Sequence, residues 1–143
     1  MAERDKPWLD VIDHTADVGI VVRAGDLRTL FVRAAWGMFS LITDPEKVSP
    51  VEAARISVSA NDRDELLRNW LSELNYRHVA EQRVFGSFAV SELTEVRAEG
   101  EARGERLDPA RHDVFGEVKA VTFHGLKVAR EGGQWVARVI FDV

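Results

Sequence analysis

Apolar residues recur at helical spacing between Leu27 and Ile42, and this pattern restricts the fold more than any other part of the sequence. The steps of three and one place these residues on one stripe of a helix. Asp26 stands where it can cap the first turn, and Pro45 ends the run. The segment therefore predicts a helix that buries one side against another layer of the protein.

A second helix is predicted after Asp62. Glu65 follows three residues later, which is the spacing of a capping box. Leu66, Trp70 and Leu74 then lie on one face of the segment. Two amphipathic helices in one short chain need a shared apolar surface to cover them.

The remaining segments alternate between apolar and polar residues, which is typical of strands. They lie at 8–14, 18–23, 55–60, 84–90, 96–102, 115–124, 126–130 and 134–142. The order is two strands, a helix, a strand, a helix and then about five strands. This order predicts an α+β domain over residues 1–143, with a mostly antiparallel sheet and both helices packed on one of its faces.

The composition excludes several classes of function. The chain has 24 acidic and 19 basic side chains, so its net charge of -5 argues against binding nucleic acid over a broad surface. It has no cysteine, which excludes disulfides, thiolate metal sites and thiol nucleophiles. The first ten residues are half charged, and no apolar run approaches the ~20 residues of a membrane helix. We therefore expect a cytoplasmic protein without a membrane segment.

Ligand-capable side chains gather in a polar turn between the first two predicted strands. Asp13, His14 and Asp17 lie within five residues of one another. Two carboxylates and an imidazole can bind a cation or transfer protons. A turn in which the side chains of Asp13 and Thr15 form hydrogen bonds with the backbone explains the same residues without a ligand. The spacing alone leaves both interpretations open.

Two further candidates lie near the end of the sequence. An apolar strand finishes at Asp142 and Val143, where adjacent anionic groups repel unless a cation or a donor neutralises them. A frayed, solvated end is the alternative.

Upstream, Glu117 and Lys119 share one face of a predicted strand and form either a surface charge pair or part of a site. His124 is either a ligand or a turn residue.

Four motifs in this order resemble the archease family, and the resemblance extends from residue 11 to residue 143. The motifs are IDHTAD at 12–17, DELLRNWLSEL at 64–74, EVKAVTFH at 117–124 and FDV at 141–143. The chain departs from the family's usual pattern at Phe123, where tyrosine is usual, at Asn75, where leucine is common, and at Val143, where isoleucine is usual. None of these departures removes a carboxylate.

The resemblance implies an accessory protein rather than an enzyme. Archeases activate the RtcB-type RNA ligase, which joins tRNA halves after an intron is removed. They speed the metal-dependent transfer of guanylate from GTP to the ligase's own histidine, and they permit multiple turnover. On this basis the partner is the ligase, and direct binding of tRNA is not expected, since the acidic chain would repel it.

The resemblance also implies a bound divalent cation, most often calcium, held by Asp17, Asp142 and Val143. Such an all-oxygen set suits a hard cation. Asp13, His14, Glu117, Lys119 and His124 would then support the site or face the partner. Two other functions stay open: a stand-alone metal-dependent hydrolase that uses Asp13, His14 and Asp17, and a chaperone-like module.

Overall fold

Helix α1 (Leu27–Ile42) begins where the sequence predicts it. The structure is a computed structural model that describes residues 6–13 and 16–143. Asp26 caps the helix, and its Oδ1 accepts a hydrogen bond from the Thr29 amide at 2.8 Å. The hydrogen bonds from Thr29 also hold the pKa of Asp26 below its usual range. A 3₁₀ turn, η2 (Pro45–Lys47), follows α1.

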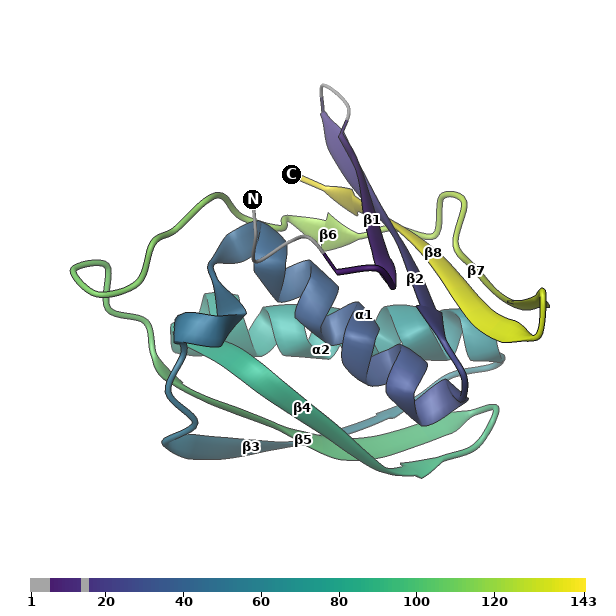
Figure 1. Ribbon diagram of the computed structural model, residues 1–143. Helices are drawn as coiled ribbons and strands as arrows, with labels where there is room; N and C mark the ends of the chain where they lie inside the picture. The colour runs from purple at the N-terminus through teal and green to yellow at the C-terminus, as the bar shows by residue number, and fades with distance from the viewer. Residues whose placement is uncertain (1–5, 14–15) are drawn as a thin grey trace.

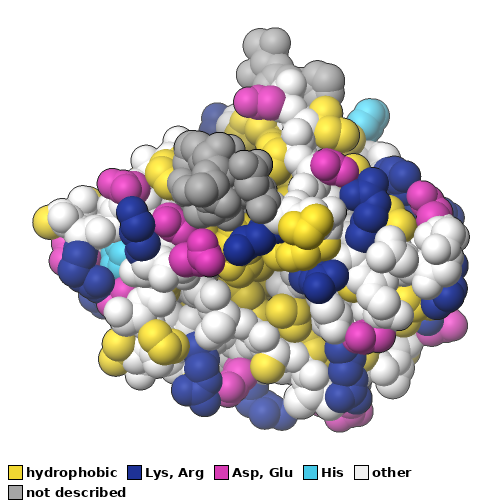
Figure 2. Space-filling view, viewed as in Figure 1, with side chains coloured by type: hydrophobic (Ala, Val, Ile, Leu, Met, Phe, Trp, Pro, Cys, Tyr) yellow, Lys and Arg dark blue, Asp and Glu magenta, His cyan; other side chains and the backbone are white. Residues whose placement is uncertain are grey.

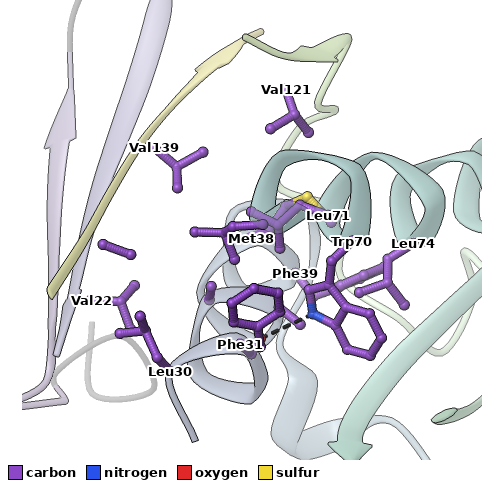
Figure 3. Close-up of a cluster of buried hydrophobic side chains, with 14 of the residues drawn as sticks. Val22, Leu30, Phe31, Met38, Phe39, Trp70, Leu71, Leu74, Val121 and Val139 are labelled. Atoms are coloured by element: carbon purple, nitrogen blue, oxygen red, sulfur yellow. Dashed lines mark hydrogen bonds between the residues drawn. The ribbon is translucent and has the colours of Figure 1, made fainter. Parts of the chain in front are cut away.

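Helix α2 (Arg63–Glu81) has the predicted capping box. The Glu65 amide donates to Asp62 Oδ1 at 2.8 Å, and Glu65 Oε1 accepts from the Asn61 amide at 2.7 Å. Trp70 is fully buried against α1, and its indole N–H donates to the Phe31 carbonyl at 3.1 Å (Figure 3). This hydrogen bond satisfies the polar atom of the largest core side chain.

The strands form two antiparallel sheets. The first contains β1 (Leu9–Asp13), β2 (Asp17–Ala24), β6 (Ala120–Val121), β7 (Lys127–Glu131) and β8 (Gln134–Asp142). Its order is β1-β2-β8-β6, and β7 also pairs with β8. The second contains β3 (Glu52–Ser59), β4 (Arg83–Leu93) and β5 (Arg97–Arg106), in the order β3-β5-β4.

Both helices lie between the two sheets (Figure 1). The α+β class, the antiparallel strands and the order of elements confirm the prediction from the sequence. The sequence predicted one sheet, however, whereas the structure divides the strands between two. The reason lies in α1, where nine of 16 residues are buried, including Ala34, Met38 and Phe39. A stripe this wide needs cover on two sides, and α1 contacts both β2 and β4.

The strand predicted at 115–124 is wrong for most of its length, because only Ala120–Val121 pairs with β8. The preceding residues are tied to the helices instead. The Phe115 amide donates to the Ile42 carbonyl at 2.8 Å, and Asn75 Nδ2 donates to the Val118 carbonyl at 2.8 Å. These hydrogen bonds take the place of the strand-to-strand hydrogen bonds that the sequence predicted for this segment. Neither described helix has the length and apolar content that a membrane crossing requires.

Candidate metal centre at the end of β8

Asp17 and Asp142 are direct neighbours across the β2–β8 pair. The Val143 amide donates to the Ala16 carbonyl at 3.4 Å, which makes 17 and 142 a non-hydrogen-bonded pair. In such a pair the two side chains leave the same face of the sheet at their closest separation. Two carboxylates from distant parts of the sequence therefore meet at one end of the first sheet.

These carboxylates lie on the face of the sheet that turns away from the helices. The adjacent residues show this, because Phe141 is fully buried in the core and its partner Val18 lines the same inner face. Alternation along a strand then puts Asp17 and Asp142 on the outer face. Within the described residues, no ion pair or side-chain hydrogen bond reaches either carboxylate.

The last strand is held on both sides up to Asp142. The Lys119 amide donates to the Asp142 carbonyl at 2.7 Å on the β6 side. On the β2 side the Val143 amide bonds to Ala16, so the backbone of this segment is fixed where the acidic side chain projects. This geometry favours a structured site over a frayed end.

The donor atoms of this site are all oxygens. Asp17 and Asp142 supply carboxylates, and the backbone of Val143 follows directly after Asp142. Oxygen ligands fit a hard divalent cation such as Ca²⁺. Residues 6–13 and 16–143 contain no group of three or more His, Cys, Asp or Glu side chains that could hold a metal. A cation here would therefore need backbone or solvent oxygen in addition to the two aspartates.

Asp13 lies on the opposite face from Asp17. It pairs with Val18 in the β1–β2 ladder, and both line a pocket of about 320 Å³ beside the end of α1. Glu117 and Val143 line the same pocket. The structure therefore separates two pairs: Asp17 with Asp142 on the outer face, and Asp13 with Glu117 on the inner face.

The other site residues predicted from the sequence lie outside the pair formed by Asp17 and Asp142. His14 lies outside the described residues. Lys119 and Glu117 precede β6 in a segment that has no strand, so they do not share a strand face as the sequence predicted. The Lys119 side chain is exposed and only its backbone amide contacts the site. His124 is exposed after β6, and its amide bonds to Thr122 Oγ1 at 3.2 Å.

A buried polar cluster around Glu105 has no counterpart among the residues predicted from the sequence. Glu105 Oε2 accepts from the Ser49 amide at 2.7 Å and lies 2.9 Å from His112 Nε2, and Arg111 pairs with the same carboxylate. The Asp108 amide donates to His112 Nδ1 at 2.9 Å, so the ring hydrogen is on Nε2 and points at Glu105.

Two opposing effects act on the Glu105 carboxyl. Burial acts to raise its pKa, but the hydrogen bonds from Ser49, His112 and Arg111 outweigh burial and lower the pKa to about 2. The cluster anchors the irregular segment 107–119, which carries Glu117 and Lys119 to the site. His112 follows Glu105 by seven positions and no motif links the two residues, so only the fold reveals their contact.

Comparisons with known proteins agree with this fold. The chain is 44% identical to the protein archease of Methanopyrus kandleri, over 96% of this chain and 99% of that protein. It is 36% identical to the protein archease of Pyrococcus abyssi, again over 96% of this chain and 99% of that one.

Two solved structures have the same fold. The solution structure of Methanobacterium thermoautotrophicum protein 1598 matches with a TM-score of 0.79 and 34% identity, covering 95% of this chain and 99% of the other. An archease from Thermotoga maritima, described as a possible chaperone, matches with a TM-score of 0.66 and 16% identity, covering 92% and 94%. The sequence model of the Archease protein family (MTH1598/TM1083) matches residues 10–143. The chain belongs to the archease family.

Proposed function

We propose that this protein activates a GTP-dependent RNA ligase of the RtcB type, promoting guanylylation of the ligase and its multiple turnover. Membership of the archease family supports the proposal. The observation that carries it is the pairing of Asp17 with Asp142, which brings together the two aspartates of the motifs at 12–17 and 141–143 that resemble the family's. The protein would act on the ligase without catalysing a reaction itself.

Asp17, Asp142 and Val143 would hold a divalent cation, most often calcium, through oxygen atoms. A bound cation supplies charge neutralisation at a place where two carboxylates project from one face. The two aspartates set the position of the ligand oxygens, and the hydrogen bonds from Lys119 and Val143 fix the strand that carries Asp142. The outer face leaves this site open to a partner.

We place this activity in the cytoplasm, and the surface charge supports a protein partner over a direct nucleic-acid partner. On the face seen in Figure 2, Lys and Arg side chains are interspersed with Asp and Glu, and they form no continuous basic area. The net charge of -5 also disfavours binding of nucleic acid. Binding of RNA over a broad surface needs clustered phosphate contacts from Lys and Arg.

The alternative of a stand-alone hydrolase built on Asp13, His14 and Asp17 has less support. Asp13 and Asp17 project from opposite faces of the first sheet, so their carboxylates do not converge on one substrate. The chaperone-like alternative has one observation in its favour, which is the description of the Thermotoga maritima relative.

The test is ligase guanylylation and multiple-turnover joining of RNA, each measured with and without this protein. We expect the protein to raise both rates when a divalent cation is present. Unchanged rates over a wide range of protein concentration would reject the proposal. RNA hydrolysis by the protein alone with Mg²⁺ or Mn²⁺ would instead support the hydrolase.

A further inference from the structure

The pocket of about 320 Å³ on the inner face of the first sheet is separate from the paired aspartates. It lies between β1, β2, the end of α1 and the irregular segment before β6. Its lining residues are Val11, Asp13, Val18, Leu41, Phe115, Gly116, Glu117 and Val143. Neither Asp17 nor Asp142 is among them. The volume is at the lower end of the range for ligand pockets, which suits one large side chain.

The pocket brings together two carboxylates that have no partner. Asp13 comes from β1 and Glu117 from the irregular segment, and across the described part of the chain no hydrogen bond or ion pair reaches either side chain. By contrast, the strand residues Glu99 and Glu131 pair with Arg55 and Arg138, each at 2.7 Å. Two unpaired anions in one concave site favour a cationic ligand.

The rest of the lining is apolar. Val11, Val18 and Leu41 line the pocket with aliphatic side chains, and Val11 and Leu41 also pack against the hydrophobic core. A bare metal ion prefers oxygen ligands on all sides and gains nothing from such walls. A long basic side chain does gain, because its hydrocarbon stem packs on apolar surface while its charged head meets the carboxylates. Guanidinium also has five donors, enough to bridge carboxylates from two different elements.

We propose that this pocket binds an arginine side chain presented by a protein partner. Aliphatic contacts with Val18 and Leu41 hold the stem, and Asp13 with Glu117 receive the guanidinium. If the partner is the ligase, the pocket gives the activator a docking contact on the opposite face of the sheet from Asp17 and Asp142, adjoining the proposed cation site at Val143, and that part of the inference rests on the proposed function. Binding of arginine itself does not depend on it.

The first experiment uses the full chain, isotope-labelled for NMR, and titrates it with N-acetyl-arginine amide. The amides of Val11, Val18 and Gly116 should shift and saturate. The citrulline analogue has the same shape without the charge and should leave them unchanged. Equal responses to arginine and citrulline, or no response at the lining residues, would overturn the proposal.

Two variants and one control locate the contact. Glu117→Gln and Asp13→Asn should each weaken binding of arginine amide about tenfold, which is typical when one charge-assisted partner is lost. Asp113→Asn is the matched control, because Asp113 is an exposed carboxylate of the same segment that does not line the pocket. The two substitutions lie in separate elements of the fold. If one variant fails to fold, the other still tests the proposal. Wild-type affinity in both folded variants would refute the assignment.

A second measurement links the pocket to the ligase. Glu117→Gln should raise about tenfold the concentration of this protein that gives half-maximal ligase stimulation, in line with its loss of arginine binding. An unchanged half-maximal concentration would reject the ligase as the source of the arginine. If the wild-type protein stimulates no ligase, the proposed function fails, while the titration with arginine amide still decides whether the pocket binds this side chain.

Discussion

At the scale of single residues, position on the sheet separates the roles of two aspartates that lie four residues apart. Asp17 projects from the outer face beside Asp142, whereas Asp13 lines the inner pocket with Glu117. The sequence motif places both in one cluster, but they lie on different strands, and the β1–β2 register sets Asp13 opposite Val18 rather than opposite Asp17, which puts the two side chains on opposite faces. Loss of the Asp17 charge should therefore have a different effect from loss of the Asp13 charge.

We predict that Asp17→Ala abolishes ligase stimulation and that Asp13→Ala weakens cation binding much less. Asp17 is half-buried and its side chain has no described hydrogen-bond partner, so the fold should tolerate alanine. Calorimetry with calcium and the guanylylation assay would measure both effects, with circular dichroism to check folding. Normal stimulation by a folded Asp17→Ala protein, or equal loss of calcium binding in both variants, would contradict this ranking.

Lys119 touches the site only through its backbone. Its amide donates to the Asp142 carbonyl, while the ammonium group is exposed and free to meet an anion on a partner or a triphosphate. We predict that Lys119→Met reduces ligase stimulation about tenfold or more with calcium affinity nearly unchanged, because methionine keeps the amide and removes the charge. Calorimetry and the joining assay separate the two quantities. A large fall in calcium affinity would show that the side chain itself acts at the cation site.

At the scale of elements, the segment 107–119 depends on the polar cluster around Glu105 for its position. Hydrogen bonds from Ser49, His112 and Arg111 lower the pKa of Glu105 to about 2, compared with the ordinary value of 4.5. A depressed carboxyl pKa stabilises the fold above the unfolded value, and that contribution is lost as the pH falls through the folded value. The segment should therefore loosen in acid between about pH 4.5 and 2.

We predict that Glu105→Gln lowers the free energy of unfolding by about 2 kcal/mol at pH 7, as expected for lost hydrogen bonds to a buried charge. The difference from the wild type should stay constant above about pH 5 and shrink as the pH falls toward 2, because the wild type then loses the same charge. Urea denaturation at several pH values would measure it. Glu101→Gln, a change at an exposed ion pair with Arg103, is the control and should cost far less.

At the scale of the whole molecule, periodicity predicted the parts of the fold that depend on local pattern. The caps at Asp26 and Asp62 and the full extent of β8 followed from the residues themselves. The division into two sheets did not, because strand pairing partners are set by distant contacts around α1. Segment 115–119 alternates like a strand but is held by the Ile42 carbonyl and Asn75, which no local pattern reveals.

The last strand joins the site to the stability of the whole fold, because β8 is central in the first sheet and carries Asp142 at its end. A cation that binds only the folded state stabilises it by about 2.7 kcal/mol at one hundred times its dissociation constant. Calcium at such a concentration should therefore raise the melting temperature of the untagged chain by several degrees, and the rise should grow with the logarithm of the calcium concentration.

A change at Val143 should weaken this rise if its backbone oxygens bind the cation. An extension fused after Val143 adds bulk beside Asp142, so we predict a smaller calcium-dependent rise and less ligase stimulation. Deleting Val143 should also reduce the rise but spare the fold, because the residue lies beyond the end of β8. A tag placed before Met1 is the control and should change neither quantity. If the untagged, extended and truncated proteins all show the same rise in a calcium titration, Val143 is not a ligand and the cation is held by Asp17 and Asp142 with solvent oxygen.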